Sequence, residues 1–135
     1  MNLSVSASLL YAIVGAVFLT YFPYLFVATA RFQVGYDMSA PRAMLDKLPP
    51  YAQRATWAHQ NCFEALIIFI AAALMAYVTG VNSSLGQYSA IAFLASRFLF
   101  SLFYILDIPL LRSLMFGIGS ASSFTLFILS LKTLG

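Results

Sequence analysis

The side chains best suited to chemistry lie at the start of one apolar segment, in the run from Arg54 to Glu64. At about 100° per residue, Arg54, Trp57, Asn61 and Glu64 of a helix fall within a stripe of roughly 80°. The apolar run 65–78 follows directly, so the Glu64 carboxylate is expected inside a membrane. A charge there is costly unless something pairs with it. The spacing therefore predicts a polar site at that depth.

Further polar residues recur in two later apolar segments. Arg97 and Tyr104 are seven residues apart, so they lie nearly one above the other on a helix, and Arg112 and Ser113 open the last segment. Arg97 is expected at a depth similar to that of Glu64, which makes it the natural counter-ion. Two interpretations follow: an ion pair that fastens helices together, or a cytoplasmic-side cavity that accepts an anionic ligand. The second is favoured.

The composition defines the elements that must position these groups. The 135 residues are 62% hydrophobic and 8% charged, against about 25% charged in a globular domain. This predicts an integral, multi-pass membrane protein. Each of four apolar segments has at least the roughly 20 residues that cross a bilayer as a helix. We therefore expect an all-α membrane protein, a single four-transmembrane-helix domain over 1–135, with helices at about 4–30, 54–79, 87–106 and 110–131 and a loop at 32–53.

Three single residues add smaller expectations. Pro23 falls inside the first segment and predicts a kink or a local adjustment. His59 has no second ligand at a suitable spacing, so no metal site is expected. Cys62 is the one cysteine, which excludes an internal disulfide and indicates a packed thiol.

The basic residues set the expected orientation. The second connection carries no lysine or arginine, whereas basic residues cluster around the first loop and Arg112 lies beside the third connection. The positive-inside rule then places those two connections in the cytoplasm and both termini on the non-cytoplasmic side. The net charge of +3 is explained by this bias, so a nucleic-acid partner is not expected. The residues that carry the bias are Arg31, Arg42, Lys47, Arg54 and Arg112.

The motif Arg54-Ala-x-x-Ala-His-x-Asn61-x-x-Glu64 resembles the second-helix signature of the MAPEG family, the membrane-associated proteins in eicosanoid and glutathione metabolism. Ser96-Arg97 with Tyr104, and Arg112-Ser113, match as well, so the resemblance covers nearly the whole chain. It implies a homotrimer, with glutathione as co-substrate between neighbouring protomers near the cytoplasmic side.

The resemblance also implies residue roles. Asn61 and Glu64 would hold the γ-glutamyl end, while Arg97 and Arg112 would help with the carboxylates or the thiolate. Arg112 would stabilise the thiolate, with Ser113 as a hypothetical thiol donor. The implied cofactor-binding residues are Arg54, Asn61, Glu64, Arg97 and Tyr104, and the implied catalytic residues are Arg112 and Ser113.

Two departures from the family pattern keep a second function open. Trp57 stands where glutathione-using members usually carry a basic residue, and Phe116 where several carry a tyrosine. The favoured function is a glutathione-dependent transferase or peroxidase that takes lipophilic electrophiles from the surrounding membrane lipids. The alternative is a non-enzymatic protein of the same fold that binds a lipid or other small amphiphile in the cytoplasmic-side cavity. A transporter or channel is disfavoured because the charges gather in one half of the membrane.

Overall fold

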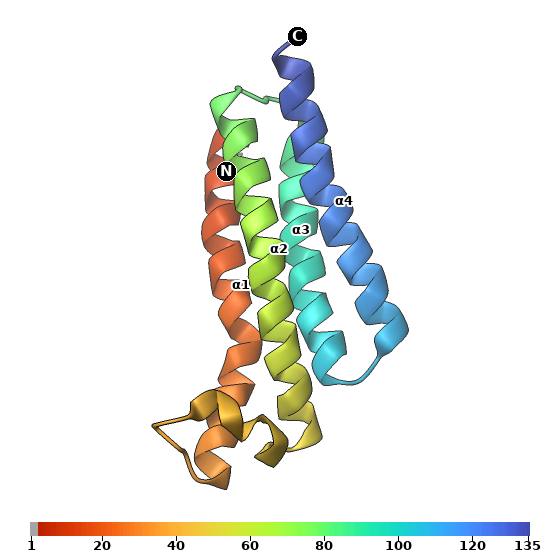
Figure 1. The fold of residues 1–135 in the computed structure, drawn as a ribbon. Coiled ribbons are helices and arrows are strands. Elements are labelled where there is room, and N and C mark those ends of the chain that lie inside the picture. The colour runs from red at the N-terminus through yellow and green to blue at the C-terminus, as the bar shows by residue number, and fades with distance from the viewer. Residues whose placement is uncertain (1–2) are drawn as a thin grey trace.

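Four long helices lie side by side in the computed structural model, which describes residues 3–135 (Figure 1). All four are long and apolar enough to cross a membrane. The start of α1 and the end of α4 lie at one end of the bundle, and the short 3₁₀ helix and the α3–α4 turn lie at the other. The predicted all-α, four-helix membrane fold is confirmed. Its elements are α1 (Val5–Val34), η1 (Pro41–Lys47), α2 (Pro50–Val78), α3 (Ser84–Ile105) and α4 (Pro109–Thr133).

The first loop is shorter than predicted, because α1 and α2 both extend into the segment 32–53. The apolar segments in the sequence predict only the part of each helix that crosses the hydrocarbon core. A helix can continue beyond that part into the headgroup region. Pro50 occupies the first turn of α2, where its missing N–H costs nothing. Gly35, with φ of 94°, ends α1 in the left-handed region that favours glycine.

Small residues let the helices approach closely. The buried positions of α2 are mostly alanine, and small side chains at an interface allow tight helix packing in a membrane. One large contact interrupts this pattern: the rings of Phe69 and Phe93 stack with centroids 3.8 Å apart. Several buried hydroxyls bond to their own helix, as Thr20 does to the carbonyl of Ala16 at 2.9 Å. These hydroxyl groups are thus satisfied without water.

Pro23 does not break α1, which runs as one helix from Val5 to Val34. Proline removes a backbone donor and disturbs the preceding turn. In that turn, the backbone oxygen of Thr20 lies 2.7 Å from Nδ1 of His59. Because a carbonyl can only accept, His59 is the donor. A neighbouring helix therefore supplies a hydrogen bond beside the proline, which is how membrane helices tolerate this residue.

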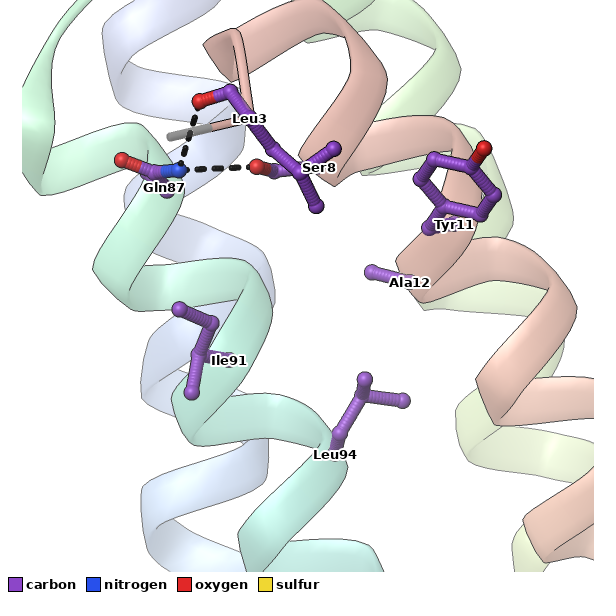
Figure 2. A pocket seen from close by; sticks show the side chains of 7 residues that line it. All are labelled: Leu3, Ser8, Tyr11, Ala12, Gln87, Ile91 and Leu94. Carbon is purple, nitrogen blue, oxygen red and sulfur yellow. Dashed lines mark hydrogen bonds between the residues drawn. The ribbon is translucent and has the colours of Figure 1, made fainter. Parts of the chain in front are cut away.

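A groove between α1 and α3 lies at the end of the bundle that holds the start of α1 (Figure 2). Its volume is about 520 Å³. Gln87 Nε2 donates to the backbone oxygen of Leu3 at 3.2 Å and to Oγ of Ser8 at 2.8 Å, so it joins the two parallel helices. No charged side chain lines the groove in the described chain, in contrast to the other end of the bundle.

Gly119 gives a test of the close α3–α4 contact. A Cβ there would lie 3.0 Å from Oγ of Ser96 and 3.4 Å from Cδ of Arg97. Ser96 already donates to the carbonyl of Phe93 at 2.9 Å and is not free to move. We expect Gly119→Ala to lower the free energy of unfolding by about 1–3 kcal/mol through overpacking, measured as a lower melting temperature in detergent.

Gly117→Ala is the matched control, because a Cβ at Gly117 would meet no atom within 4 Å. Its expected effect is a gain of up to ~1 kcal/mol from helix propensity. If both variants melt at the same temperature, the contact at Gly119 is not as tight as described.

Candidate functional site

The turn between α3 and α4 brings the polar residues of three helices together. Asp107 adopts a left-handed φ of 61°, which aspartate tolerates better than most residues. The amide of Asp107 donates to the carbonyl of Tyr104 at 3.2 Å, and that of Ile108 to the carbonyl of Phe103 at 2.9 Å. Pro109 then opens α4 immediately. The chain therefore reverses within a few residues, and the first turn of α4 returns alongside the last turn of α3.

Arg97 is the most deeply buried charge of the bundle, with 3% of its surface exposed. Its Nη2 donates to Oδ1 of Asn61 at 2.8 Å and to Sγ of Cys62 at 3.4 Å. Its guanidinium carbon lies 4.0 Å from the centroid of the Phe100 ring. All three partners are neutral, whereas a guanidinium stays charged in proteins. Burying a charge without an opposite charge is unfavourable, so this site favours an anion.

The prediction that Glu64 and Arg97 form an ion pair is wrong within a single protomer. Arg97 lies against the adjacent residues Asn61 and Cys62 of α2, and Glu64 is exposed on the protomer surface. The helical projection explains the difference. Glu64 lies about 60° to one side of Asn61, while Cys62 lies about 100° to the other. A side chain that contacts both Asn61 and Cys62 therefore points away from Glu64.

A cavity of about 270 Å³ lies beside this buried charge, between α2, α3 and α4. The guanidinium carbon of Arg112 lies 4.5 Å from the centroid of the Tyr104 ring, so the ring supports the cation at the cavity wall. Four of the predicted site residues line this cavity. Arg97 does not line it but contacts two residues that do, Asn61 and Phe100. The lining residues are Asn61, Phe100, Tyr104, Arg112, Ser113 and Phe116.

Besides Arg97, two predicted site residues do not line the cavity. Arg54 donates through Nε at 3.1 Å and Nη2 at 3.0 Å to the backbone oxygen of Ile105. This contact satisfies a carbonyl in the last turn of α3, a usual partner for a basic side chain. Glu64 lies on the exposed side of α2, where Trp57 is also exposed. The four residues of the predicted 80° stripe therefore have different environments. Arg54 bonds to α3, Asn61 lines the cavity, and Trp57 and Glu64 are exposed.

Phe100 is a site residue that the sequence reasoning missed. It lies three residues after Arg97 and four before Tyr104, a spacing that places all three on one face of α3. Cys62 is the second omission: its thiol lies 3.4 Å from Oγ of Ser101, besides its contact with Arg97. The helical spacing would have found Phe100, whereas the Cys62 contacts depend on how α2 and α3 are rotated against each other.

The fold and this site define a class, a multi-pass integral membrane protein whose four-helix bundle holds a cationic cavity near one end. The model of the MAPEG family matches residues 8–132, and the chain belongs to that family. Members of this family are generally associated with glutathione. No curated protein and no solved structure matches the chain.

Asn61 offers a test of the uncompensated charge on Arg97. Asn61→Asp would place a carboxylate at the position that now lies 2.8 Å from Nη2 of Arg97. We expect this variant to raise the melting temperature in detergent, because it pairs a charge that is already desolvated. Asn61→Leu has a similar volume but removes the acceptor, and is expected to destabilise the protein by about 1–3 kcal/mol. If aspartate destabilises as much as leucine, the Arg97 charge is already compensated.

Proposed function

We propose that this protein binds glutathione and acts as a transferase or peroxidase on lipophilic electrophiles. The observation that carries the proposal is a cavity that Arg112 lines, that has no acidic lining residue in the described chain, and whose lining residues Asn61 and Phe100 contact the buried guanidinium of Arg97. Glutathione carries two carboxylates, one ammonium group and a thiol. Arginine is well suited to bind carboxylates, because its fork of N–H donors matches their geometry.

Asn61 and Glu64 belong to the same proposal as the residues that hold the γ-glutamyl end. The Asn61 amide faces the cavity, and the Glu64 carboxylate lies one helical turn further along α2. Arg112 would favour the thiolate form of the bound tripeptide, because a nearby cation stabilises the anionic sulfur. In the transferase reaction, the thiolate sulfur forms a bond to an electrophilic carbon, and the electron pair of the broken bond leaves with the displaced group.

The exposed position of Glu64 supports a homotrimer in this proposal. Glu64 lies midway between Pro50 and Val78, so a lone protomer would present its carboxylate to lipid at the centre of the span. Such an arrangement is costly, and a neighbouring protomer would cover it. The cavity of about 270 Å³ is smaller than most ligand sites, which measure about 300–1,000 Å³. A neighbour would complete the glutathione site.

The proposal places the cavity toward the cytoplasm and both termini on the opposite side. The support is the basic first loop, which lies at the same end of the bundle as the α3–α4 turn (Figure 1). The second substrate would enter from the bilayer, since Phe116 lines the cavity and is exposed on α4. Holding both reactants at one site contributes through proximity.

The first test is a calorimetric titration of the detergent-solubilised protein with glutathione. Wild type is expected to bind, and Arg97→Ala and Glu64→Gln are each expected to abolish binding, because they remove a charge complementary to the tripeptide. Lys132→Gln removes a charge in the last turn of α4, at the other end of the bundle, and is the matched control. Unchanged affinity in both site variants would refute the proposal.

The second test separates the two residues proposed for the thiolate. Arg112→Gln is expected to lower turnover by about 10²-fold, a typical loss when one stabilising donor is removed. It should also reduce the thiolate absorbance of bound glutathione. Ser113→Ala should lower turnover without removing a charge, and unchanged turnover in this variant would exclude Ser113 as the thiol donor.

Trp57 and Phe116 favour a second candidate, a non-enzymatic protein that binds a lipid or another small amphiphile. The ring of Phe116 faces that of Phe100 across a centroid distance of 6.4 Å, which makes this wall of the cavity apolar. A co-purified amphiphile near Arg97, in protein with no affinity for glutathione, would support this function over the first.

A further inference from the structure

A small crevice lies deeper in the bundle than the cavity around Asn61 and Arg112, and it is also formed by α2, α3 and α4. Its volume is about 30 Å³. Its wall on α2 begins at Ala65, about one helical turn beyond Asn61 and near the middle of the helix. The two spaces share no lining residue. The function proposed for the larger cavity therefore leaves the crevice without a role.

Two serines of α4 line this crevice with free hydroxyls. Ser120 and Ser123 lie three residues apart, so they share one face of the helix. Other hydroxyls of α4, those of Ser122, Thr125 and Ser130, donate to the carbonyl four residues earlier at 2.7–2.8 Å. The hydroxyls of Ser120 and Ser123 make neither this bond nor another hydrogen bond within residues 3–135. The two hydroxyls that face the crevice thus differ from their neighbours.

Ser123 is the more informative of the two serines. Only 2% of its surface is exposed. Its unpaired Oγ is not enclosed by protein atoms, so it opens onto the crevice that the residue lines. A hydroxyl that leaves water without gaining a partner is costly, and polar groups inside a membrane need an internal partner. This hydroxyl therefore indicates that a small ligand in the crevice completes its hydrogen bonding.

Arg97 supplies the charge that selects the ligand. It lines the crevice and has 3% of its surface exposed. Its hydrogen bonds to Asn61 and Cys62 both start from Nη2, so Nε and Nη1 have no acceptor within residues 3–135. No aspartate or glutamate lines the crevice in the described chain. A buried cation beside two hydroxyls favours an anion, because each of these groups can donate a hydrogen bond to it.

The size of the crevice excludes most anions. One water molecule needs a cavity of about 10–15 Å³, so a volume of about 30 Å³ suits a ligand that is only slightly larger. A chloride ion has that size, whereas phosphate, sulfate and free carboxylates contain several heavy atoms. Ile68 and Phe124 line the crevice and are exposed on the protomer surface, so its opening is apolar. An ion inside is shielded from bulk water, which strengthens its attraction to Arg97.

We propose that this crevice binds a single halide ion, with chloride as the natural ligand. Arg97 would provide the opposite charge, and Ser120 and Ser123 would donate hydrogen bonds from α4. The ion would join α3 to α4 at the depth where Arg97 has no charged partner. The inference does not depend on glutathione, because the crevice is separate from the larger cavity.

A single water molecule in the crevice makes a different prediction. Water would satisfy the two hydroxyls and leave the Arg97 charge unpaired. The melting temperature would then depend on the salt in the buffer only through its general effect on solubility and screening. That general effect acts equally on wild type and on variants of the two serines, whereas a bound halide acts on them differently.

The experiment measures the melting temperature of the full chain in detergent and without glutathione. Chloride or bromide replaces gluconate, which is too large for the crevice, at constant ionic strength. Wild type is expected to show a saturable rise in melting temperature. Ser123→Ala is expected to weaken the apparent halide affinity by about 10–100-fold, because a hydrogen bond to an ion is lost. Ser120→Ala, at a less buried position, is expected to weaken it as well.

Ser122→Ala is the matched control, because Ser122 is buried on the same helix but bonds to the carbonyl of Ile118 and does not line the crevice. It should respond to halides as wild type does. Equal melting temperatures of wild type in chloride and in gluconate would overturn the proposal in favour of water. The same halide response in wild type, Ser120→Ala and Ser123→Ala would also overturn it, because the ions would then bind elsewhere.

A crystal grown in bromide gives an independent readout through the anomalous scattering of this ion. An anomalous peak between Arg97 and Ser123 in wild type, absent in Ser123→Ala, would locate the ion. Bromide peaks only at other positions would contradict the site. Because neither measurement includes glutathione, a protein that fails to bind glutathione can still pass both tests, and the two proposals fail independently.

Discussion

A membrane interior leaves a buried guanidinium few ways to be stabilised, and the packing of α2, α3 and α4 around Arg97 follows from that constraint. Only 3% of the Arg97 surface is exposed, so Asn61, Cys62 and Phe100 replace water as its neighbours. Each offers a dipole, a polarisable sulfur or a π-face, and none offers a charge. These contacts orient the cation without neutralising it. The protomer therefore holds a fixed positive charge next to a cavity, which is a suitable arrangement for binding an anion.

Small residues are what allow this arrangement. Gly119 of α4 passes so close to Arg97 that a Cβ would lie 3.4 Å from its Cδ. The glycine thus closes the bundle over the aliphatic stem of the arginine. Ser96, buried beside it, bonds to its own helix and leaves the arginine without competition for Asn61. Helix packing and the position of the charge therefore depend on each other. A bulkier residue in place of Gly119 would displace both α4 and the Arg97 side chain.

Much of the fold could be predicted because it depends on length and apolarity, which the sequence states directly. Four segments long enough to cross a bilayer specify four helices, and Asp107-Ile-Pro109 specifies a tight turn. The partner of Arg97 could not be predicted in the same way. The choice between Glu64 and the pair Asn61 and Cys62 is set by the rotation of α2 about its axis. The rotation of α2 depends on how many small residues pack on each of its sides. The spacing of a few residues along the sequence does not contain this information.

A pocket around Arg31 was beyond prediction for a related reason. In the sequence, Arg31 and Arg42 are two of several basic residues near a loop, and a topology signal accounts for all of them equally well. Folding separates them. η1 returns toward the end of α1 and brings Arg31 and Arg42 to one pocket, while Arg54 bonds to the end of α3. Lys47 stays exposed. One orienting charge cluster thus becomes three different environments, and within residues 3–135 Arg31 alone keeps a buried side-chain atom without a hydrogen-bond partner.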